Sequence, residues 1–94
     1  MDIKIIWTYP ALNDLEDIYQ YIAKDSEFYA TSFVNEVKTA AKSLSFFANR
    51  GRVIPEFGND SIREIFIKKY RLIYQYKDNT VYILSFIHGA RDLS

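Results

Sequence analysis

The sequence predicts an α+β fold in which a hairpin of two helices packs on a twisted antiparallel sheet. Two apolar stripes with helical spacing occupy the N-terminal half of the chain, and three short runs rich in β-branched and aromatic residues occupy the C-terminal third. A further short strand precedes the helices, so the expected element order is β-α-α-β-β-β. We expect the 94 residues to form one domain, 1–94, because a chain of this length fits a single core.

The first expected elements are a strand at residues 3–7 and a helix at about 9–24. The strand segment is rich in β-branched residues. Thr8 then provides a helix N-cap, and Pro10 falls in the first turn, where its missing N–H costs no hydrogen bond. The apolar positions of this helix keep a 3.6-residue period at Ala11, Leu15, Ile18 and Ile22.

A second helix is expected after the polar break at Lys24, Asp25 and Ser26. Its apolar face is predicted to consist of Ala30, Phe33, Val34, Val37, Ala41, Leu44 and Phe47. Two antiparallel helices joined by so few residues form a hairpin. Each helix then presents an apolar stripe that needs a partner surface.

That surface is predicted to be a sheet formed by the C-terminal part of the chain. Residues 48–61 lose the helical period and contain two glycines and a proline, which indicates the longest loop of the chain. Strands follow at residues 62–67, 70–76 and 81–87, with short connections suited to antiparallel hairpins. The helical hairpin is expected to cover one face of this meander, with the first strand lying along it.

Charged residues are divided unevenly although the net charge is zero. Residues 1–49 hold four lysines against seven acids, a net charge of −3, and residues 50–94 hold eight bases against five acids, a net charge of +3. The C-terminal half is therefore basic, which is a property of surfaces that attract charged partners. The alternative interpretation is ordinary solvated charge scattered over the surface.

The chain contains no cysteine, which excludes disulfides, thiolate metal sites and thiol catalysis and suits a reducing cytosol. The N-terminus lacks the basic stretch and long apolar run of a signal peptide, and no apolar segment is long enough to span a bilayer. We expect a cytoplasmic protein that binds no membrane and uses no cofactor and no metal.

Short motifs follow one another in a fixed order along nearly the whole chain. They are Trp7 with Ala11, Asp14, Leu15, Ile18, Tyr21 and Ile22, then Leu44, Gly51-Arg52, Arg63-Glu64, Tyr70-Arg71-Leu72-Ile73-Tyr74 and His88-Gly89-Ala90-Arg91-Asp92. Each motif alone has little specificity. The ordered set resembles the ParE-like branch of the RelE/ParE toxin superfamily.

The resemblance implies the toxin of a type II toxin–antitoxin, or plasmid stabilisation, system. It implies a partner encoded beside the toxin, a cognate antitoxin whose C-terminal segment wraps it. ParE-like members are associated with inhibition of DNA gyrase by binding, and RelE-like members cut mRNA in the ribosome. The expected target is therefore DNA gyrase. The alternatives are a ribosome-dependent mRNA endonuclease and a degenerate toxin that acts only as an antitoxin-binding partner.

Candidate catalytic residues follow from the chemistry of RNA cleavage. Attack by a 2′-hydroxyl without a metal needs a base, cations for the phosphorane charge and an acid for the leaving oxygen. If the chain is a nuclease, the candidates are Arg52, Arg63, Arg71 and His88. Glu56 and Glu64 are available as bases, but Glu64 alternates with Arg63 on a strand and can simply pair across the sheet. Because no acid is matched to a base, binding is favoured over a reaction.

The candidates for binding the target or the antitoxin are Arg63, Arg71 and Arg91. Arg63 and Arg91 lie at expected strand ends, and Arg71 should face the side of the sheet opposite to its neighbours Tyr70 and Leu72. A purely structural alternative stands beside each interpretation. Arg71 can be a solvated sheet residue, and the His88 imidazole can bond to the backbone or to Asp92.

Overall fold

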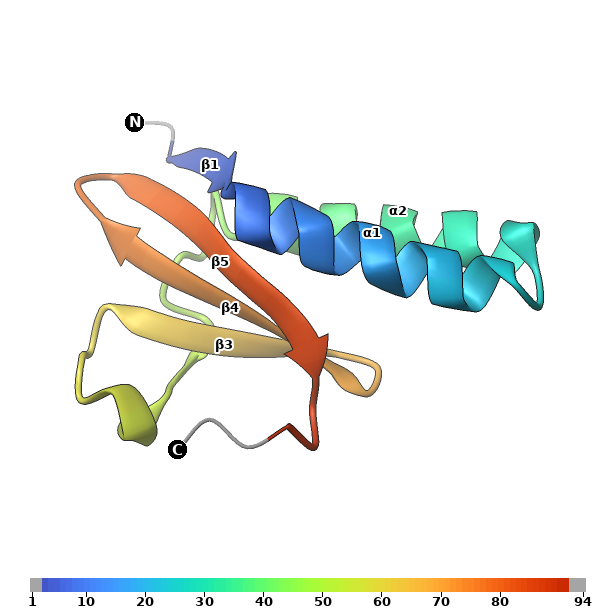
Figure 1. Cartoon of the computed structure of the whole chain (residues 1–94). Coiled ribbons are helices and arrows are strands. Elements are labelled where there is room, and N and C mark those ends of the chain that lie inside the picture. The colour runs from blue at the N-terminus through green and yellow to red at the C-terminus, as the bar shows by residue number, and fades with distance from the viewer. Residues whose placement is uncertain (1–2, 92–94) are drawn as a thin grey trace.

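The structure, a computed structural model, describes residues 3–91 of the chain. In chain order (Figure 1) the elements are β1 (Lys4–Trp7), α1 (Tyr9–Ala23), α2 (Glu27–Ser43), β2 (Arg52–Val53), the 3-10 turn η1 (Pro55–Phe57), β3 (Ile62–Ile67), β4 (Tyr70–Lys77) and β5 (Thr80–His88). The predicted α+β class and the order β-α-α-β-β-β are confirmed. The segment expected as one long loop differs, because it contains the two-residue strand β2 and the turn η1.

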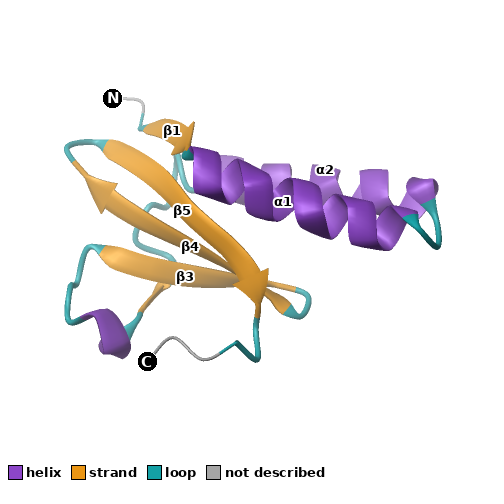
Figure 2. Cartoon of the chain, in the orientation of Figure 1, coloured by secondary structure: helices purple, strands orange, loops and turns teal. Residues whose placement is uncertain are grey.

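The five strands form one sheet in the order β1-β5-β4-β3-β2. β1 pairs with β5 in parallel, and the remaining neighbours are antiparallel. Both helices lie on one side of this sheet, and the tip of the hairpin projects beyond it (Figure 2). We call the opposite side the open face.

Two separate apolar clusters lie on the two sides of the sheet. The main core joins the helices to the inner side of the strands and includes Ala11, Leu15, Phe33, Val37, Leu44, Ile65, Leu72, Tyr74, Ile83 and Phe86. The smaller cluster consists of Ile54, Ile73 and Ile87, with Ile62 and Leu84 packed against it. The second cluster is on the open face, so β4 buries side chains on both sides.

The first helix begins where the sequence predicts. Thr8 Oγ1 accepts a hydrogen bond from the Ala11 amide at 3.4 Å, which is N-cap geometry, and Pro10 stands in the first turn. The same hydroxyl donates to the carbonyl of Ile83 at 2.7 Å. This residue therefore caps α1 and ties it to β5.

A β-bulge changes which side chains of β5 point to the helices. The register pairs Ile73 with Ser85 and Tyr74 with Ile83, so Leu84 is the extra residue on β5. The amide of Phe86 donates to Asp14 Oδ2 of α1 at 2.9 Å. A carboxylate of the first helix thus satisfies a strand amide just beyond the bulge.

The second helix ends earlier than its apolar pattern predicts. Phe47 was expected on the buried face, but α2 ends at Ser43 and the Phe47 side chain is exposed. Serine hydroxyls bond to the last carbonyls, from Ser43 to Ala40 at 2.6 Å and from Ser45 to Lys42 at 2.8 Å. Such local bonds compete with continuation of the helix, so the chain turns away before Phe47 can reach the core.

The strand connections agree with the predicted hairpins. Ile67 pairs with Tyr70 and Lys77 pairs with Thr80, so each turn has two residues. Asp78 and Asn79 have φ values of 53° and 58°, which is the conformation a type I′ turn requires and one that Asp and Asn tolerate. Among the helices of residues 3–91, none is long and apolar enough to cross a membrane.

Candidate functional site

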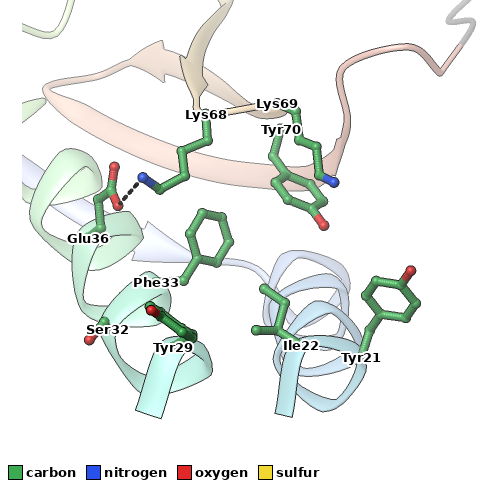
Figure 3. Close-up of a pocket in the computed structure, with 9 residues that line it drawn as sticks. All are labelled: Tyr21, Ile22, Tyr29, Ser32, Phe33, Glu36, Lys68, Lys69 and Tyr70. Atoms are coloured by element: carbon green, nitrogen blue, oxygen red, sulfur yellow. Dashed lines mark ion pairs between the residues drawn. The ribbon is translucent and has the colours of Figure 1, made fainter. Parts of the chain in front are cut away.

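A groove opens between the outer half of the helical hairpin and the turn that joins β3 to β4. It has a volume of about 490 Å³ (Figure 3), and its lining residues are Tyr21, Ile22, Tyr29, Ser32, Phe33, Glu36, Lys68, Lys69 and Tyr70. Figure 3 shows Phe33 between the two helices, with Ile22 on the facing helix. The Phe33 and Tyr70 rings pack with their centroids 5.4 Å apart, so the floor of the groove is aromatic.

The rim of this groove carries exposed aromatic and cationic side chains. Tyr21 and Tyr29 are both about two-thirds exposed, at 67% and 68%. Lys68 pairs with Glu36 across the groove at 3.6 Å. Lys69 makes no ion pair with any residue in the described part of the chain. An apolar floor with one unneutralised cation at its edge suits an apolar segment that carries an acidic side chain.

The open face of the sheet carries a second arrangement, in which one carboxylate meets two arginines. Glu64 stands on β3 with a side chain that is 0% exposed. Its Oε2 accepts hydrogen bonds from Arg52 Nε at 3.0 Å and Arg52 Nη2 at 2.5 Å. Its Oε1 lies 3.3 Å from Arg71 Nε of β4. We call these three residues the Glu64 network.

Arg71 is the less exposed arginine of this network. Its side chain is 13% exposed, against 62% for Arg52. Its guanidinium lies 5.9 Å from the centre of the Phe66 ring, and Nε and Nη1 have no hydrogen-bond acceptor among the described residues. The sequence places Arg71 on the side opposite to Tyr70 and Leu72, and the structure agrees.

The contact with Glu64 favours the charged form of Arg52. The pKa of Arg52 is raised above its ordinary value, first by the hydrogen bond to Glu64 and then by the charge of that carboxylate. Burial lowers this pKa in part, and the charge of Glu56 raises it further. The guanidinium of Arg52 is therefore fully charged and directed at Glu64.

Arg63 lies on the other side of the same strand, where it holds the loop before β2. Its Nη1 donates to the carbonyls of Gly51 at 2.8 Å and Asn49 at 3.2 Å. Tyr74 bonds to the same loop, since its buried hydroxyl donates to the Ala48 carbonyl at 2.7 Å and accepts from the Gly51 amide at 3.0 Å. These bonds position β2, and with it Arg52.

His88 and Arg91 lie at the far end of β5. The His88 ring stacks edge-on against Tyr70 at 5.7 Å, and its Nδ1 accepts from the Ala90 amide at 3.1 Å. This bond matches the structural interpretation of His88, although Asp92 lies outside the described residues. His88 and Arg91 line a hollow of about 330 Å³ together with Asp14 and Asp17 of α1.

The four candidate nuclease residues do not gather at one point. Arg52 and Arg71 share the open face, whereas Arg63 and His88 are on the side of the helices. Arg63 pairs in register with Tyr74, and His88 pairs with Tyr70, four residues along β4. The three candidate binding residues Arg63, Arg71 and Arg91 are likewise distributed over separate surfaces.

The sequence did not reveal Glu64 as the centre of the network. Its alternation with Arg63 indicated that Glu64 pairs across the sheet, and it does so with Arg52 of β2 and Arg71 of β4. The strand β2 was not predicted, because two residues are too few to show an alternating strand pattern. Arg52 stands opposite Glu64 in the register of that short strand.

Within residues 3–91, no group of three or more histidine, aspartate and glutamate side chains is placed to hold a metal ion. The described residues form an apolar groove, an arginine pair that shares one carboxylate, and a histidine bonded to the backbone. Together they define a small α+β protein with an apolar groove beside its helical hairpin and a carboxylate–arginine network on the opposite side of its sheet.

Comparison with known proteins assigns this class to a family. Residues 5–93 match the family described as the ParE toxin of the type II toxin–antitoxin system parDE. A curated relative, Toxin RelE2 of Caulobacter vibrioides, is 34% identical over 89 residues, which cover 94% of this chain and 97% of the relative. The chain therefore belongs to the ParE toxin family of type II toxin–antitoxin systems.

A solved structure shows the same fold. A chain of the chromosomal ParDE toxin–antitoxin system from P. aeruginosa has a TM-score of 0.75 to this one, with 22% sequence identity. The match covers 92% of this chain and 95% of that chain. The P. aeruginosa chain thus shares the arrangement of two helices on a five-stranded, mostly antiparallel sheet.

Proposed function

We propose that this toxin inhibits DNA gyrase by binding to it and not by a reaction of its own. The observation that carries this proposal is the Glu64 network. Arg71 is only 13% exposed and faces a buried carboxylate, and Arg52 directs two of its donors at the same carboxylate, so Glu64 would compete with a phosphorane for both arginines. The only histidine of the chain is on the other side of the sheet, bonded to the backbone.

We further propose that the cognate antitoxin places part of its C-terminal segment in the groove of Figure 3. Apolar side chains of that segment would lie on Ile22, Phe33 and Tyr70, and an acidic side chain would meet Lys69. A segment that folds as it binds gains enough apolar contact here to offset part of its ordering entropy. The charge at the rim predicts an affinity that falls with salt.

Supercoiling by purified gyrase tests the target directly. The toxin is titrated into relaxed plasmid, gyrase and ATP, and the fraction of supercoiled product is read from a gel. Inhibition that disappears when the toxin is first mixed with its antitoxin is the expected result. Supercoiling that is unchanged at a high excess of toxin contradicts the proposal.

A second candidate function is ribosome-dependent cleavage of mRNA, in which Arg52, Arg63, Arg71 and His88 would act on phosphate. The name of the Caulobacter relative, Toxin RelE2, is the observation that favours it. Primer extension on messages isolated after induction separates the two functions. New 5′ ends within reading frames support cleavage, and intact messages with inhibited gyrase support the first proposal. A degenerate toxin that only binds its antitoxin would give neither result.

A further inference from the structure

We propose that the toxin contacts gyrase through Phe46, Phe47 and Arg50, and that these residues bind an apolar segment of the enzyme that carries a carboxylate. This inference rests on the proposed function and names the surface that performs it. We call the three residues the phenylalanine patch. The patch follows the C-terminal end of α2, whereas the groove proposed for the antitoxin takes its α2 residues from Tyr29 to Glu36.

Both phenylalanines of the patch expose their side chains, Phe46 at 77% and Phe47 at 67%. They border a hollow of about 470 Å³, whose lining residues are Ile3, Phe46, Phe47, Ala48, Asn49, Arg50 and Tyr76. An apolar ring in water lacks the free energy that burial provides, and contact with another molecule recovers it. Two adjacent exposed rings beside a hollow are therefore typical of a protein contact, in which aromatic residues supply much of the binding energy.

The backbone that carries the two rings is fixed by hydrogen bonds. The Arg50 amide donates to the Phe47 carbonyl at 3.0 Å. The buried Tyr74 hydroxyl holds the following residues through the Ala48 carbonyl and the Gly51 amide. This backbone is thus ordered before a partner arrives, which reduces the entropy cost of binding.

Charge around the patch defines the chemistry of its partner. Residues 37–55 contain no acid and four cations, which are Lys38, Lys42, Arg50 and Arg52. Arg52 is paired with Glu64, whereas Lys42 and Arg50 form no ion pair with any residue between positions 3 and 91. A carboxylate on the partner would therefore complement Arg50 at the edge of the apolar contact.

A protein segment fits this patch better than a nucleic acid does. Bases could stack on the aromatic rings, but binding of a strand also depends on cations that follow its phosphates. Among the described residues, Arg50 is the one cation that lines the hollow. One guanidinium suffices for a single carboxylate and is too little for a backbone that carries a charge at every nucleotide.

Inhibition of gyrase supercoiling by patch variants tests the inference. We expect Phe46→Ala and Phe47→Ala each to raise the toxin concentration for half-inhibition by about tenfold, as loss of an aromatic interface residue does. Phe28→Ala is the matched control, because Phe28 is 74% exposed at the opposite end of α2 and its variant should inhibit like the wild type. An equal loss in Phe28→Ala and Phe47→Ala would overturn the inference, as would no loss in Phe47→Ala.

A charge variant tests the carboxylate on the partner. Arg50→Gln should weaken inhibition at low salt, and its difference from the wild type should shrink at high salt, where the ion pair is screened. Lys24→Gln makes the same change in net charge at the exposed tip of the hairpin and should inhibit like the wild type at both salt concentrations. Inhibition by Arg50→Gln that equals that of the wild type at low salt would overturn the inference.

Antitoxin affinity shows whether a patch variant keeps its fold. The groove of Figure 3 lies away from the patch, so Phe47→Ala should bind the antitoxin with wild-type affinity in a calorimetric titration. A parallel loss of gyrase inhibition and antitoxin affinity would overturn the assignment of this patch to gyrase.

The same assays separate failure of this inference from failure of the proposed function. A wild-type toxin that leaves supercoiling unchanged overturns both, whereas a wild type and a Phe47→Ala variant that inhibit equally overturn the inference alone. Anisotropy of a fluorescein-labelled single-stranded DNA without gyrase, and sedimentation of the toxin alone, should give the same result for wild type and Phe47→Ala. DNA binding or a dimer that Phe47→Ala loses would assign the patch to nucleic acid or to a second copy, and either result overturns the inference.

Discussion

Glu64 Oε2 accepts two hydrogen bonds from Arg52, at 3.0 Å from Nε and 2.5 Å from Nη2, across the pairing of β2 with β3. The same carboxylate faces Arg71 on the other neighbouring strand. A fully buried acid is therefore compensated from both sides, which is the condition under which a charge is tolerated in a protein interior.

Breaking the buried part of this network should destabilise the fold strongly. Glu64→Leu leaves Arg71 buried without a countercharge, and we expect it to lower the free energy of unfolding by about 3–5 kcal/mol. The double variant Glu64→Leu/Arg71→Leu replaces the pair with apolar side chains beside Ile73, and it should recover most of that loss. Urea unfolding of the single and double variants measures the difference. Additive losses in the double variant would contradict the proposed coupling.

Removing the Tyr74 hydroxyl should loosen the loop that positions β2. Tyr74→Phe leaves the buried Ala48 carbonyl and Gly51 amide without their partner. We expect a loss of about 1–3 kcal/mol in the free energy of unfolding, measured by thermal or urea unfolding. Tyr9→Phe is the control, because Tyr9 is 83% exposed and its variant should unfold like the wild type. Equal stability of the two variants would mean that the buried bonds contribute nothing.

Tyr74 should also make the free energy of unfolding depend on pH in the alkaline range. Burial raises the pKa of Tyr74 above its ordinary value of 10.0, and the Gly51 bond and the charges of Arg63 and Arg50 offset this only in part. With the folded pKa above the unfolded one, the contribution is fully present below pH 10.0 and is lost as the pH rises through the folded pKa. The stability difference between wild type and Tyr74→Phe should therefore shrink above that pH. A difference that is constant or grows would contradict the raised pKa.

Antitoxin affinity should depend on the rim of the groove and not on exposed tyrosines elsewhere. Tyr29 is 68% exposed at the groove, so Tyr29→Ala should spare the fold and weaken antitoxin binding by about tenfold, as loss of an aromatic interface residue does. Tyr9→Ala is the matched control, since Tyr9 is exposed on α1 outside the groove. Calorimetric titration of the antitoxin into each variant gives the affinities. Equal losses in both variants would place the antitoxin elsewhere.

Alternation along the strands predicted the orientation of Arg71 but not that of His88. Arg71 faces away from Tyr70 and Leu72 because β4 is regular up to Ile73. On β5 the extra residue Leu84 shifts the alternation, so His88 returns to the side of Tyr70 and the helices. No glycine or proline marks this bulge in the sequence. The Phe86 amide beside it is bonded to Asp14 of α1, which is distant in the chain.

Helix starts were predicted more accurately than the end of α2. Thr8 and Ser26 cap the two helices with their side chains, and both positions follow from local chemistry. The end at Ser43 was missed, because the apolar period continues to Phe47 while serine hydroxyls take the last carbonyls. The Glu64 network was also missed, since it depends on pairing between β2 and β3 that no local pattern records.

Pulse-labelling of DNA and protein synthesis in bacteria tests the proposed target most directly. The toxin is induced without its antitoxin, and incorporation of labelled thymidine and labelled amino acids is followed over time. Inhibition of gyrase predicts that DNA synthesis fails first, while protein synthesis continues for longer. Protein synthesis that fails first would contradict gyrase inhibition, and it would make His88 and the arginines candidates for RNA cleavage.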